Sequence, residues 1–250
     1  MRVIINADDL GINGAVNARV FDLMGRRKLT SATVLANGPE LESAVTESAQ
    51  HPDCSFGVHL NITEFRPLTR NPALEPILDR EGQFAGKEVV RRARMTGTLR
   101  KAIHDEWAAQ VMKARALGLR VSHLDSHEFI HTVPSLLPVL KAVQRRTELR
   151  KVRNTQNIYP DPGPPWTLLA KKKLWTLALK HWYPTTTTDA FTLLSVFYLW
   201  MNDRHRVPYS SVELMTHPGS PAYEEETQLL TTNWQASPPF AVKLISYHEL

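Results

Sequence analysis

The feature that most constrains the fold of this chain is an alternation of short apolar runs with longer stretches of helical period. In the longer stretches, apolar residues recur every three or four positions, as they do on one side of a helix. The runs predict strands at residues 2–6, 30–37, 54–60, 118–127, 151–157, 211–217 and 241–247. The longer stretches predict helices at residues 14–28, 39–50, 98–117, 134–146, 166–183 and 223–234.

Strands that alternate with helices are typical of βα units, whose strands pair in parallel while the helices pack outside the sheet. About seven or eight such units favour a TIM-barrel-like (β/α) barrel, closed or distorted, as a single domain over residues 1–250. The alternative is an open doubly wound sheet. No glycine-rich phosphate loop follows a predicted strand, so the barrel is favoured.

Composition excludes several classes of protein. Of the 250 residues, 42% are hydrophobic, which suffices for one large core. The single cysteine, Cys54, permits neither an internal disulfide nor a CxxC metal site. The net charge of +5 suits anionic partners, but aromatic and basic residues do not interleave as in nucleic-acid modules, so no nucleic-acid partner is expected.

The hydrophobic runs predict a soluble, cytoplasmic protein. The sequence begins directly with an apparent strand and shows no apolar leader with a small-residue cleavage site. The longest apolar run, residues 191–200, is too short to cross a bilayer.

Ionisable side chains gather where the predicted strands end. They are Asp8 and Asp9, His59, the group His123, Asp125, His127 and His131, and His217. Because the carboxyl ends of parallel strands meet at one face, where barrel active sites lie, these side chains are expected to converge.

The adjacent carboxylates of Asp8 and Asp9 point to a cation. Two buried like charges repel one another, and a cation nearby removes that cost. One aspartate with two histidines, leaving positions open for water and substrate, is a common catalytic metal set. One carboxylate would then bind the ion while the other stays free beside it.

Each signal has a plainer structural interpretation. Asp8 and Asp9 are also compatible with capping of the helix that follows near Asn13. His59 alone is compatible with a hydrogen-bonded core histidine, and His217, which precedes Pro218 and Gly219, is compatible with the start of a turn. Their shared position at strand ends favours a functional site over these separate explanations.

The fourth predicted strand is the most informative. His123, Asp125 and His127 alternate, so they are expected to face the same way, and three inward ionisable groups are difficult to explain as plain core. Asp125 is expected to orient a histidine ligand, and His131, beyond the strand, to lie beside the site. For Arg153, at another strand end, a structural ion pair and a contact with Asp8 or the substrate both remain open.

The motifs "NADDLG", "GVHLN", "HLDSHEFIH" and "MTHPG", in this order, resemble those of the YdjC/ChbG family of carbohydrate deacetylases, which includes the hopanoid-associated HpnK group. The resemblance extends along nearly the whole chain. It implies a TIM-barrel-like fold, one divalent metal ion (Mg²⁺ or Zn²⁺), and removal of acetyl groups from N-acetylated sugars such as chitooligosaccharides.

The resemblance also implies individual roles. Asp9, His59 and His127 would bind the metal, Asp8 would be the catalytic base, and His217 would be the catalytic acid. Asp8 would take a proton from water, and His217 would protonate the leaving amine.

The sequence departs from the family pattern at several places. Phe129 stands where the family often has a histidine, and Leu10 replaces a usual phenylalanine. The regions 166–183 and 185–200 match no family motif. The first carries lysines beside a possible apolar stripe of Trp166, Leu169, Leu174 and Leu177. Two interpretations are a barrel helix with a solvated lysine face and a helix that docks on an anionic membrane.

Two other functions stay open at this stage. One is a different metal-dependent amide or phosphoester hydrolase on the same barrel, since a fold does not determine its chemistry. The other is a non-catalytic sugar-binding protein. A homodimer is also compatible with the sequence.

Overall fold

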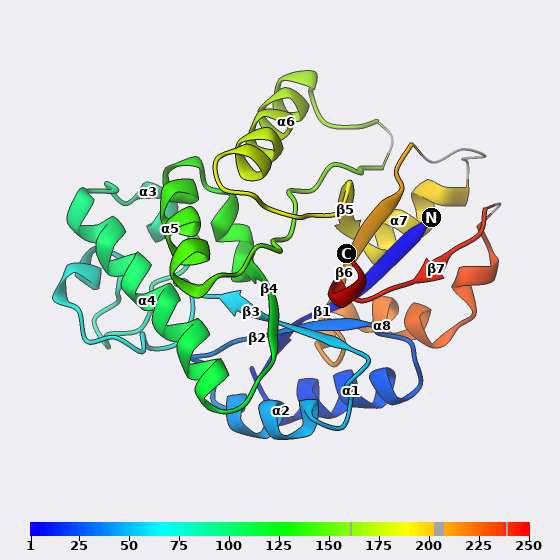
Figure 1. Cartoon of the computed structure of the whole chain (residues 1–250), viewed down its shortest axis with the longest axis horizontal. Helices are drawn as coiled ribbons and strands as arrows, with labels where there is room; N and C mark the ends of the chain where they lie inside the picture. Colours follow the sequence, from blue (N-terminus) through cyan, green and yellow to red (C-terminus); the bar gives the residue numbers. More distant parts are fainter. Residues whose placement is uncertain (161, 203–207, 239) are drawn as a thin grey trace.

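The computed structural model describes residues 1–250 except 161, 203–207 and 239, and its strands form one parallel sheet with helices around it (Figure 1). The strands are β1 Arg2–Leu10, β2 Ser31–Val34, β3 Ser55–Leu60, β4 Val121–Ser126, β5 Ala190–Leu193, β6 Ser211–Thr216 and β7 Lys243–Leu244. The helices are α1 Gly14–Gly25, α2 Leu41–Ser48, α3 Lys87–Arg92, α4 Gly97–Ala116, α5 Leu137–Thr147, α6 Trp166–His181, α7 Leu194–Asn202 and α8 Glu224–Thr231.

The sheet is a parallel half-barrel. Its strand order is β4-β3-β2-β1-β6-β5, and β7 pairs with the first residues of β1. Isolated parallel bridges span the side between β4 and β5, where Leu124 pairs with Val152 and Lys151 pairs with Thr186. The predicted parallel α/β fold is therefore confirmed as a half-barrel, without the regular ring of a TIM barrel among the described strands.

Two segments differ from the sequence prediction. Residues 151–157, predicted as a strand, supply only the bridges just described. Conversely, residues 190–202 form β5 and α7, which the prediction left unassigned. Their sequence is a nearly continuous apolar run, which shows neither the two-residue period of a half-exposed strand nor the period of an amphipathic helix.

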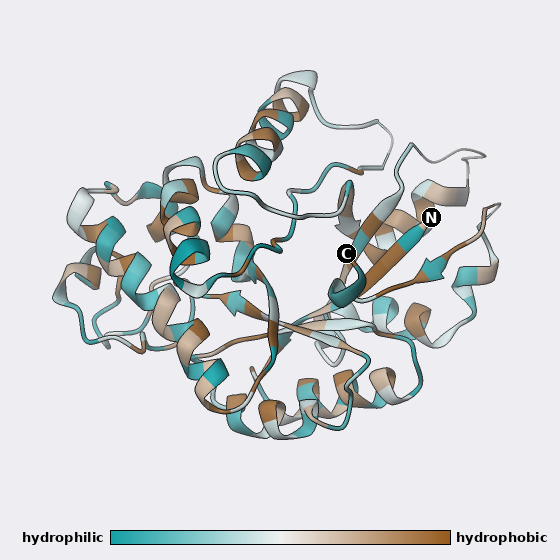
Figure 2. Cartoon of the chain, in the orientation of Figure 1, coloured by the Kyte–Doolittle hydropathy of each residue, from teal (hydrophilic) through white to brown (hydrophobic). Residues whose placement is uncertain are grey.

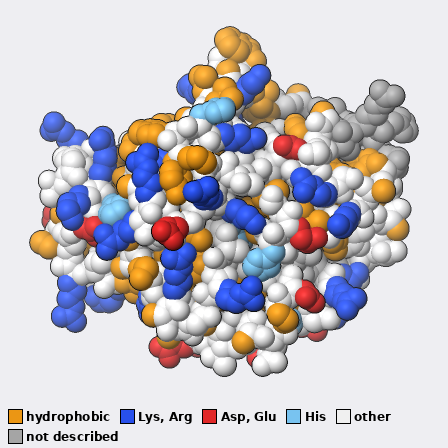
Figure 3. Space-filling view, viewed as in Figure 1, with side chains coloured by type: hydrophobic (Ala, Val, Ile, Leu, Met, Phe, Trp, Pro, Cys, Tyr) orange, Lys and Arg blue, Asp and Glu red, His pale blue; other side chains and the backbone are white. Residues whose placement is uncertain are grey.

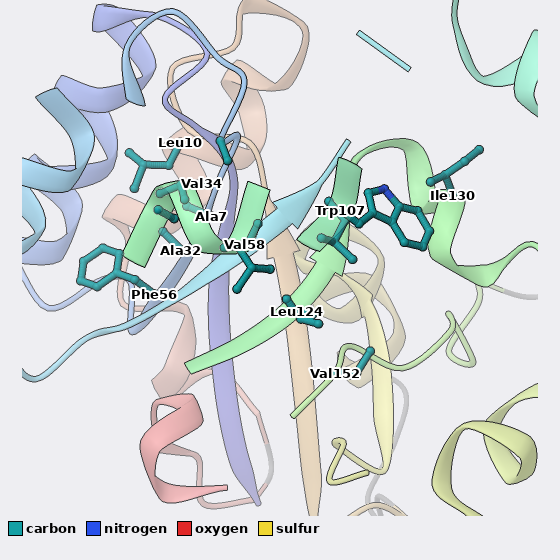
Figure 4. Close-up of a cluster of buried hydrophobic side chains, with 14 of the residues drawn as sticks. Ala7, Leu10, Ala32, Val34, Phe56, Val58, Trp107, Leu124, Ile130 and Val152 are labelled. Atoms are coloured by element: carbon teal, nitrogen blue, oxygen red, sulfur yellow. The ribbon is translucent and has the colours of Figure 1, made fainter. Parts of the chain in front are cut away.

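The core lies between the sheet and the surrounding helices. Figure 4 shows Val58 of β3 and Leu124 of β4 near Trp107 of α4, and these three side chains are fully buried. Hydrophobic residues run along β1 in Figure 2, and Val3, Ile4 and Ile5 have no exposed surface. A central strand of a parallel sheet is covered on both faces, which explains why β1 begins with consecutive apolar residues.

Candidate functional site

A bulge at the end of β1 brings the two adjacent aspartates to one site. Pairing with β2 is regular at Ala7 and shifts register before Leu10, and Asp9 has φ 64°. In a regular strand, neighbouring side chains point to opposite faces. Here Oδ2 of Asp8 lies 3.9 Å, and Oδ1 of Asp9 3.4 Å, from Nε2 of His59. A left-handed backbone at a residue other than glycine is strained, and such strain is concentrated at functional sites.

The helix-cap interpretation of the aspartates is not supported. Oδ1 of Asn13 accepts a hydrogen bond of 2.9 Å from the amide of Val16, so Asn13 caps α1. The carboxylates of Asp8 and Asp9 lie instead near His59, in the site at the end of β1.

Asp9, His59 and His127 come together from three strand ends. Ligand atoms of these residues all lie within 4.8 Å of one another. Nδ1 of His127 is 2.8 Å from Oδ1 of Asp9. His127 follows the last residue of β4, and Glu128 and Phe129 after it both have left-handed backbones, with φ 54° and 56°. This tight turn ends the strand beside Asp9.

The outer nitrogen of each histidine contacts a further carboxylate. Nδ1 of His59 is 2.7 Å from Oδ1 of Asp125, its neighbour in the register between β3 and β4. Nε2 of His127 is 3.1 Å from Oε2 of Glu64. Carboxylates in these positions fix the tautomer and orientation of metal-binding imidazoles. Glu64 was missed by the sequence prediction, and its only signal was its place a few residues after His59 in a long loop.

Arg153 is fully buried and holds Asp8 with a two-pronged contact. Its Nη1 and Nη2 lie 2.7 and 2.6 Å from the two carboxylate oxygens of Asp8. Nη1 is also 2.8 Å from Asp125, and Nε donates a 2.8 Å bond to Glu213. The structure therefore places Arg153 in a buried network of ion pairs that includes Asp8. The sequence left open a structural ion pair and a contact with Asp8, and this network is both.

Burial opposes ionisation of Asp8, but the charge of Arg153 and its hydrogen bonds outweigh burial and lower the pKa of Asp8 to about 2. Nδ2 of Asn6 adds a 2.9 Å hydrogen bond to Oδ1. Asp8 is therefore a fixed, fully ionised carboxylate at neutral pH.

The donor set suits a divalent cation. Burial disfavours protonated imidazoles, yet the carboxylates of Asp125 and Asp8 raise the pKa of His59 to about 10. Hydrogen bonds to Asp9 and Glu64 raise the pKa of His127 to about 9 despite its burial. This excess of negative charge calls for positive charge at the site, and one aspartate with two imidazoles is a usual ligand set for a metal ion.

A second set of possible ligands, Asp8, His59 and Asp125, shares one histidine with the first. Arg153 already binds both carboxylates of that set. Because a metal ion would compete with this guanidinium for the same oxygens, the set of Asp9, His59 and His127 is the better candidate for a metal site.

His217, which follows β6, faces the same space as the aspartates. A cavity of about 110 Å³ is lined by Asp8, Asp9 and His217, among others. The imidazole stacks on Tyr223 at 4.3 Å between ring centroids. Burial disfavours its charge, but Glu226, with Oε2 3.9 Å from Nδ1, and the two aspartates raise the pKa of His217. The carbonyl oxygen of His217 also accepts a hydrogen bond from the amide of Ser220, which begins a turn. His217 therefore both lines the candidate site and begins a turn, the two interpretations that the sequence allowed.

Two further predicted residues lie apart from the donor set. The ring of His123 stacks on Tyr247 at 3.6 Å, and Nδ1 of His131 is 2.6 Å from Oγ of Ser126. Burial lowers the pKa of His123 well below its usual value, and burial together with Arg153 lowers that of His131 to about 3. Both are neutral, and their described hydrogen bonds do not reach the metal-ligand candidates.

Phe129, which replaces a family histidine, packs its ring edge against Phe191 at 5.9 Å between centroids. The Phe191 ring in turn faces the guanidinium of Arg153 at 4.9 Å. The aromatic pair therefore covers one side of the buried charge network.

The half-barrel, with its cluster of carboxylates and imidazoles at the carboxyl ends of the strands, places the chain among α/β barrel-type proteins that carry an enzyme-like site at this edge. The chain belongs to the YdjC-like protein family, whose model matches residues 2–240. The family predicted from the four motifs is thereby confirmed.

Relatives of the chain are named carbohydrate deacetylase. The protein of Brevibacillus brevis is 29% identical over 261 aligned positions, which cover 100% of this chain and 93% of that protein. The protein of Oceanobacillus iheyensis is 29% identical, over 88% of this chain and 86% of that one. That of Geobacillus stearothermophilus is 33% identical, but the match spans only 61% of this chain and 60% of the relative.

The fold is also similar to a solved structure. A protein of Enterococcus faecalis V583 named for cellobiose-phosphate cleavage superposes with a TM-score of 0.78 at 20% identity, covering 99% of this chain and 98% of that one. This likeness supports the fold over the full length of the chain.

Proposed function

We propose that the protein is a metal-dependent carbohydrate deacetylase that removes an acetyl group from an N-acetylated sugar. Membership of the YdjC-like family and the names of the relatives support the class of enzyme. The observation that carries the proposal is the convergence of Asp9, His59 and His127 beside the ionised Asp8. A single domain over residues 1–250, a cytoplasmic location and a homodimer remain predictions from the sequence.

Asp9, His59 and His127 would hold one divalent ion, with Zn²⁺ favoured by the imidazoles and Mg²⁺ compatible with the carboxylate. When bound, such an ion polarises the acetyl carbonyl and lowers the pKa of a coordinated water. Asp125 and Glu64 hold the two imidazoles in the orientation that binding requires.

The proton transfers fall to two residues that line one cavity. Asp8, fixed by Arg153, accepts a proton from the attacking water. His217 donates a proton to the leaving nitrogen of the sugar, because an amine departs poorly as an anion. Its raised pKa favours the protonated form that this step needs.

Acetate release from a panel of N-acetylated sugars, including chitooligosaccharides, tests the proposal. Protein stripped with a chelator should be inactive, and Zn²⁺ or Mg²⁺ should restore activity at about one ion per chain. Absence of acetate release from every sugar, or hydrolysis of phosphoesters alone, contradicts the proposed function. Sugar binding without turnover contradicts it as well.

Two variants separate metal binding from chemistry. Asp8→Asn should keep the metal and lose activity by about a hundredfold to ten-thousandfold, the usual contribution of a general base. Asp9→Asn should weaken metal binding and regain part of its activity in excess ion. Asp53→Asn, an exposed aspartate elsewhere, is the matched control and should behave as the parent. Parental turnover by Asp8→Asn shows that Asp8 is not the base.

A further inference from the structure

The helix α6 exposes large apolar side chains on its outer side. It projects from the body of the molecule in Figure 1. Trp175 and Leu179 of its inner side are buried, whereas Trp166 is 78% exposed, Leu174 66% and Leu177 44%. Most helices on the surface of a globular protein turn polar residues outward, so apolar residues on both sides indicate a second contact surface.

The most exposed of these residues lie along one side of the helix, and Leu168 and Leu169 are exposed to a lesser extent. Trp166, Ala170, Leu174 and Leu177 are spaced by four, four and three positions, which places them in a row, called here the outer stripe. Lys171 and Lys173 are exposed and flank the row. The helix contains no acidic residue. In Figure 3, hydrophobic side chains cover the top of the molecule, with basic side chains on both sides of them.

The inner side of α6 is held against the rest of the molecule in the second half of the helix, from Trp175 to Leu179. Nζ of the buried Lys141 donates a hydrogen bond to the carbonyl of Leu179, and Oγ1 of Thr176 donates a 2.8 Å bond to Asn154. The ring of Trp175 meets that of His131 edge-on at 5.7 Å. Because Asn154 follows Arg153 in the sequence, these contacts tie the helix to the end of the sheet that carries the site.

We propose that the outer stripe of α6 docks on a bilayer that contains anionic phospholipids. A helix of this kind lies in the interface, with its apolar side among the acyl chains and its lysines at the headgroups. Tryptophan, exposed here at Trp166 and Trp182, is enriched in that region of membrane proteins. No helix among the described residues has the length and apolar character needed to cross a bilayer.

Charge favours an anionic surface over a second copy of the chain. In a symmetric dimer through the outer stripe, the same surface meets itself, which would bring Lys171 and Lys173 of one copy against those of the other. Within the described part of the chain, no segment covers the stripe. The chain as a whole carries a net charge of +5, which adds to the attraction to anionic lipid.

Flotation with vesicles tests the proposal on the full chain. The protein should float with phosphatidylcholine vesicles that contain phosphatidylglycerol at low salt, and should float far less with phosphatidylcholine alone or at high salt. Each lysine near an anionic surface strengthens binding about fivefold, so Lys171→Glu with Lys173→Glu should weaken partitioning more than tenfold. Trp166→Ser with Leu174→Ser should abolish it.

Matched controls lie outside α6. Met112→Ser removes a side chain that is 53% exposed on α4, and Arg94→Glu with Arg100→Glu reverses two exposed charges; these variants should float as the parent does. Thermal unfolding should give the same midpoint for all variants, because Trp175 and Leu179 are untouched. As an independent readout, tryptophan emission should shift to the blue on vesicle binding, and less in Trp166→Phe.

Three results overturn the proposal. The first is no flotation with anionic vesicles at low salt. The second is an equal loss in the controls and in the outer-stripe variants. The third is a dimer in sedimentation velocity that Trp166→Ser dissociates, which would assign the stripe to a second copy of the chain.

Discussion

Replacing Arg153 by lysine keeps a positive charge in the buried network and removes its geometry. The guanidinium makes two contacts with Asp8, of 2.7 and 2.6 Å, and one each of 2.8 Å with Asp125 and Glu213. A lysine ammonium is a compact charge on a flexible stem and cannot reproduce the parallel pair of bonds to one carboxylate. Asp8 would remain ionised but lose its fixed orientation.

The magnitude follows from the contacts that are lost. A buried hydrogen bond to a charged group contributes about 1.5–3 kcal/mol, and lysine should lose one or two of the four, so Arg153→Lys should lower the free energy of unfolding by about 1.5–6 kcal/mol. Arg153→Met leaves three buried carboxylates without their cation and should cost at least about 3–5 kcal/mol. Displacement of the Asp8 carboxylate by about 1 Å should reduce turnover about a hundredfold.

Urea unfolding of chelator-treated protein and acetate release by metal-loaded protein measure the two effects separately. Arg115→Lys is the matched control, because Arg115 donates one hydrogen bond to the carbonyl of Thr147 and contacts no carboxylate in the described structure. It should change stability by less than about 1 kcal/mol. If Arg153→Lys matches this control in both assays, the guanidinium of Arg153 does not position Asp8.

Three other perturbations probe the site. Glu64→Gln and Asp125→Asn should each weaken metal binding about tenfold to a hundredfold in a titration, and parental affinity in both would show that these carboxylates do not orient the ligands. His217→Gln should lower kcat about a hundredfold or more, and it should remove the alkaline limb of the rate profile that deprotonation of the parent His217 produces above pH 6.5. In the metal-free protein, the raised pKa values of His59 and His127 contribute stability that is complete below pH 6.5 and lost as the pH rises through about 9 to 10. Unfolding midpoints measured across this range should fall for metal-free protein and stay level for loaded protein.

The sequence predicts the convergence of the main site residues because topology does most of the positioning. Once the strands are known to be parallel, the residues that follow β1, β3 and β4 must lie at one edge of the sheet. Asp9, His59 and His127 meet there. Asp125 was expected to orient a histidine ligand without that histidine being specified, and pairing in register brings it beside His59.

Local backbone detail could not be predicted in the same way. Regular alternation would send Asp8 and Asp9 to opposite faces, and only the bulge and the positive φ of Asp9 bring both to the site. Glu64 reaches His127 from a long loop whose path depends on tertiary packing. Glu213 is one charged residue within an apolar strand, and its partner Arg153 is distant in sequence.

The histidines in and just after β4 differ in role although they are close in the sequence. His123 and His131 share a short motif with His127, yet both are buried and neutral in the folded protein. His123 fits because Gly57 opposite leaves room, since a Cβ there would lie 2.7 Å from the imidazole ring. Residue type alone does not separate a packed histidine from a ligand.

Carboxylates outnumber the positively charged side chains around the site. Asp8, Asp9, Asp125 and Glu64 all lie against His59 or His127, and two of these four carboxylates also pair with the guanidinium of Arg153. Burial raises the pKa of Glu213 to about 7, so this carboxyl is partly ionised near neutral pH and adds to the negative charge.

A divalent ion would offset this excess of negative charge, and protons on His59 and His127, whose pKa values are about 10 and 9, offset it in the metal-free protein. The metal-free protein should therefore be folded at neutral pH, with two imidazolium groups in place of the ion, but inactive. Circular dichroism and acetate release on the same chelator-treated sample test this directly. A metal-free protein that is unfolded at pH 7 would mean that protons on His59 and His127 do not replace the ion.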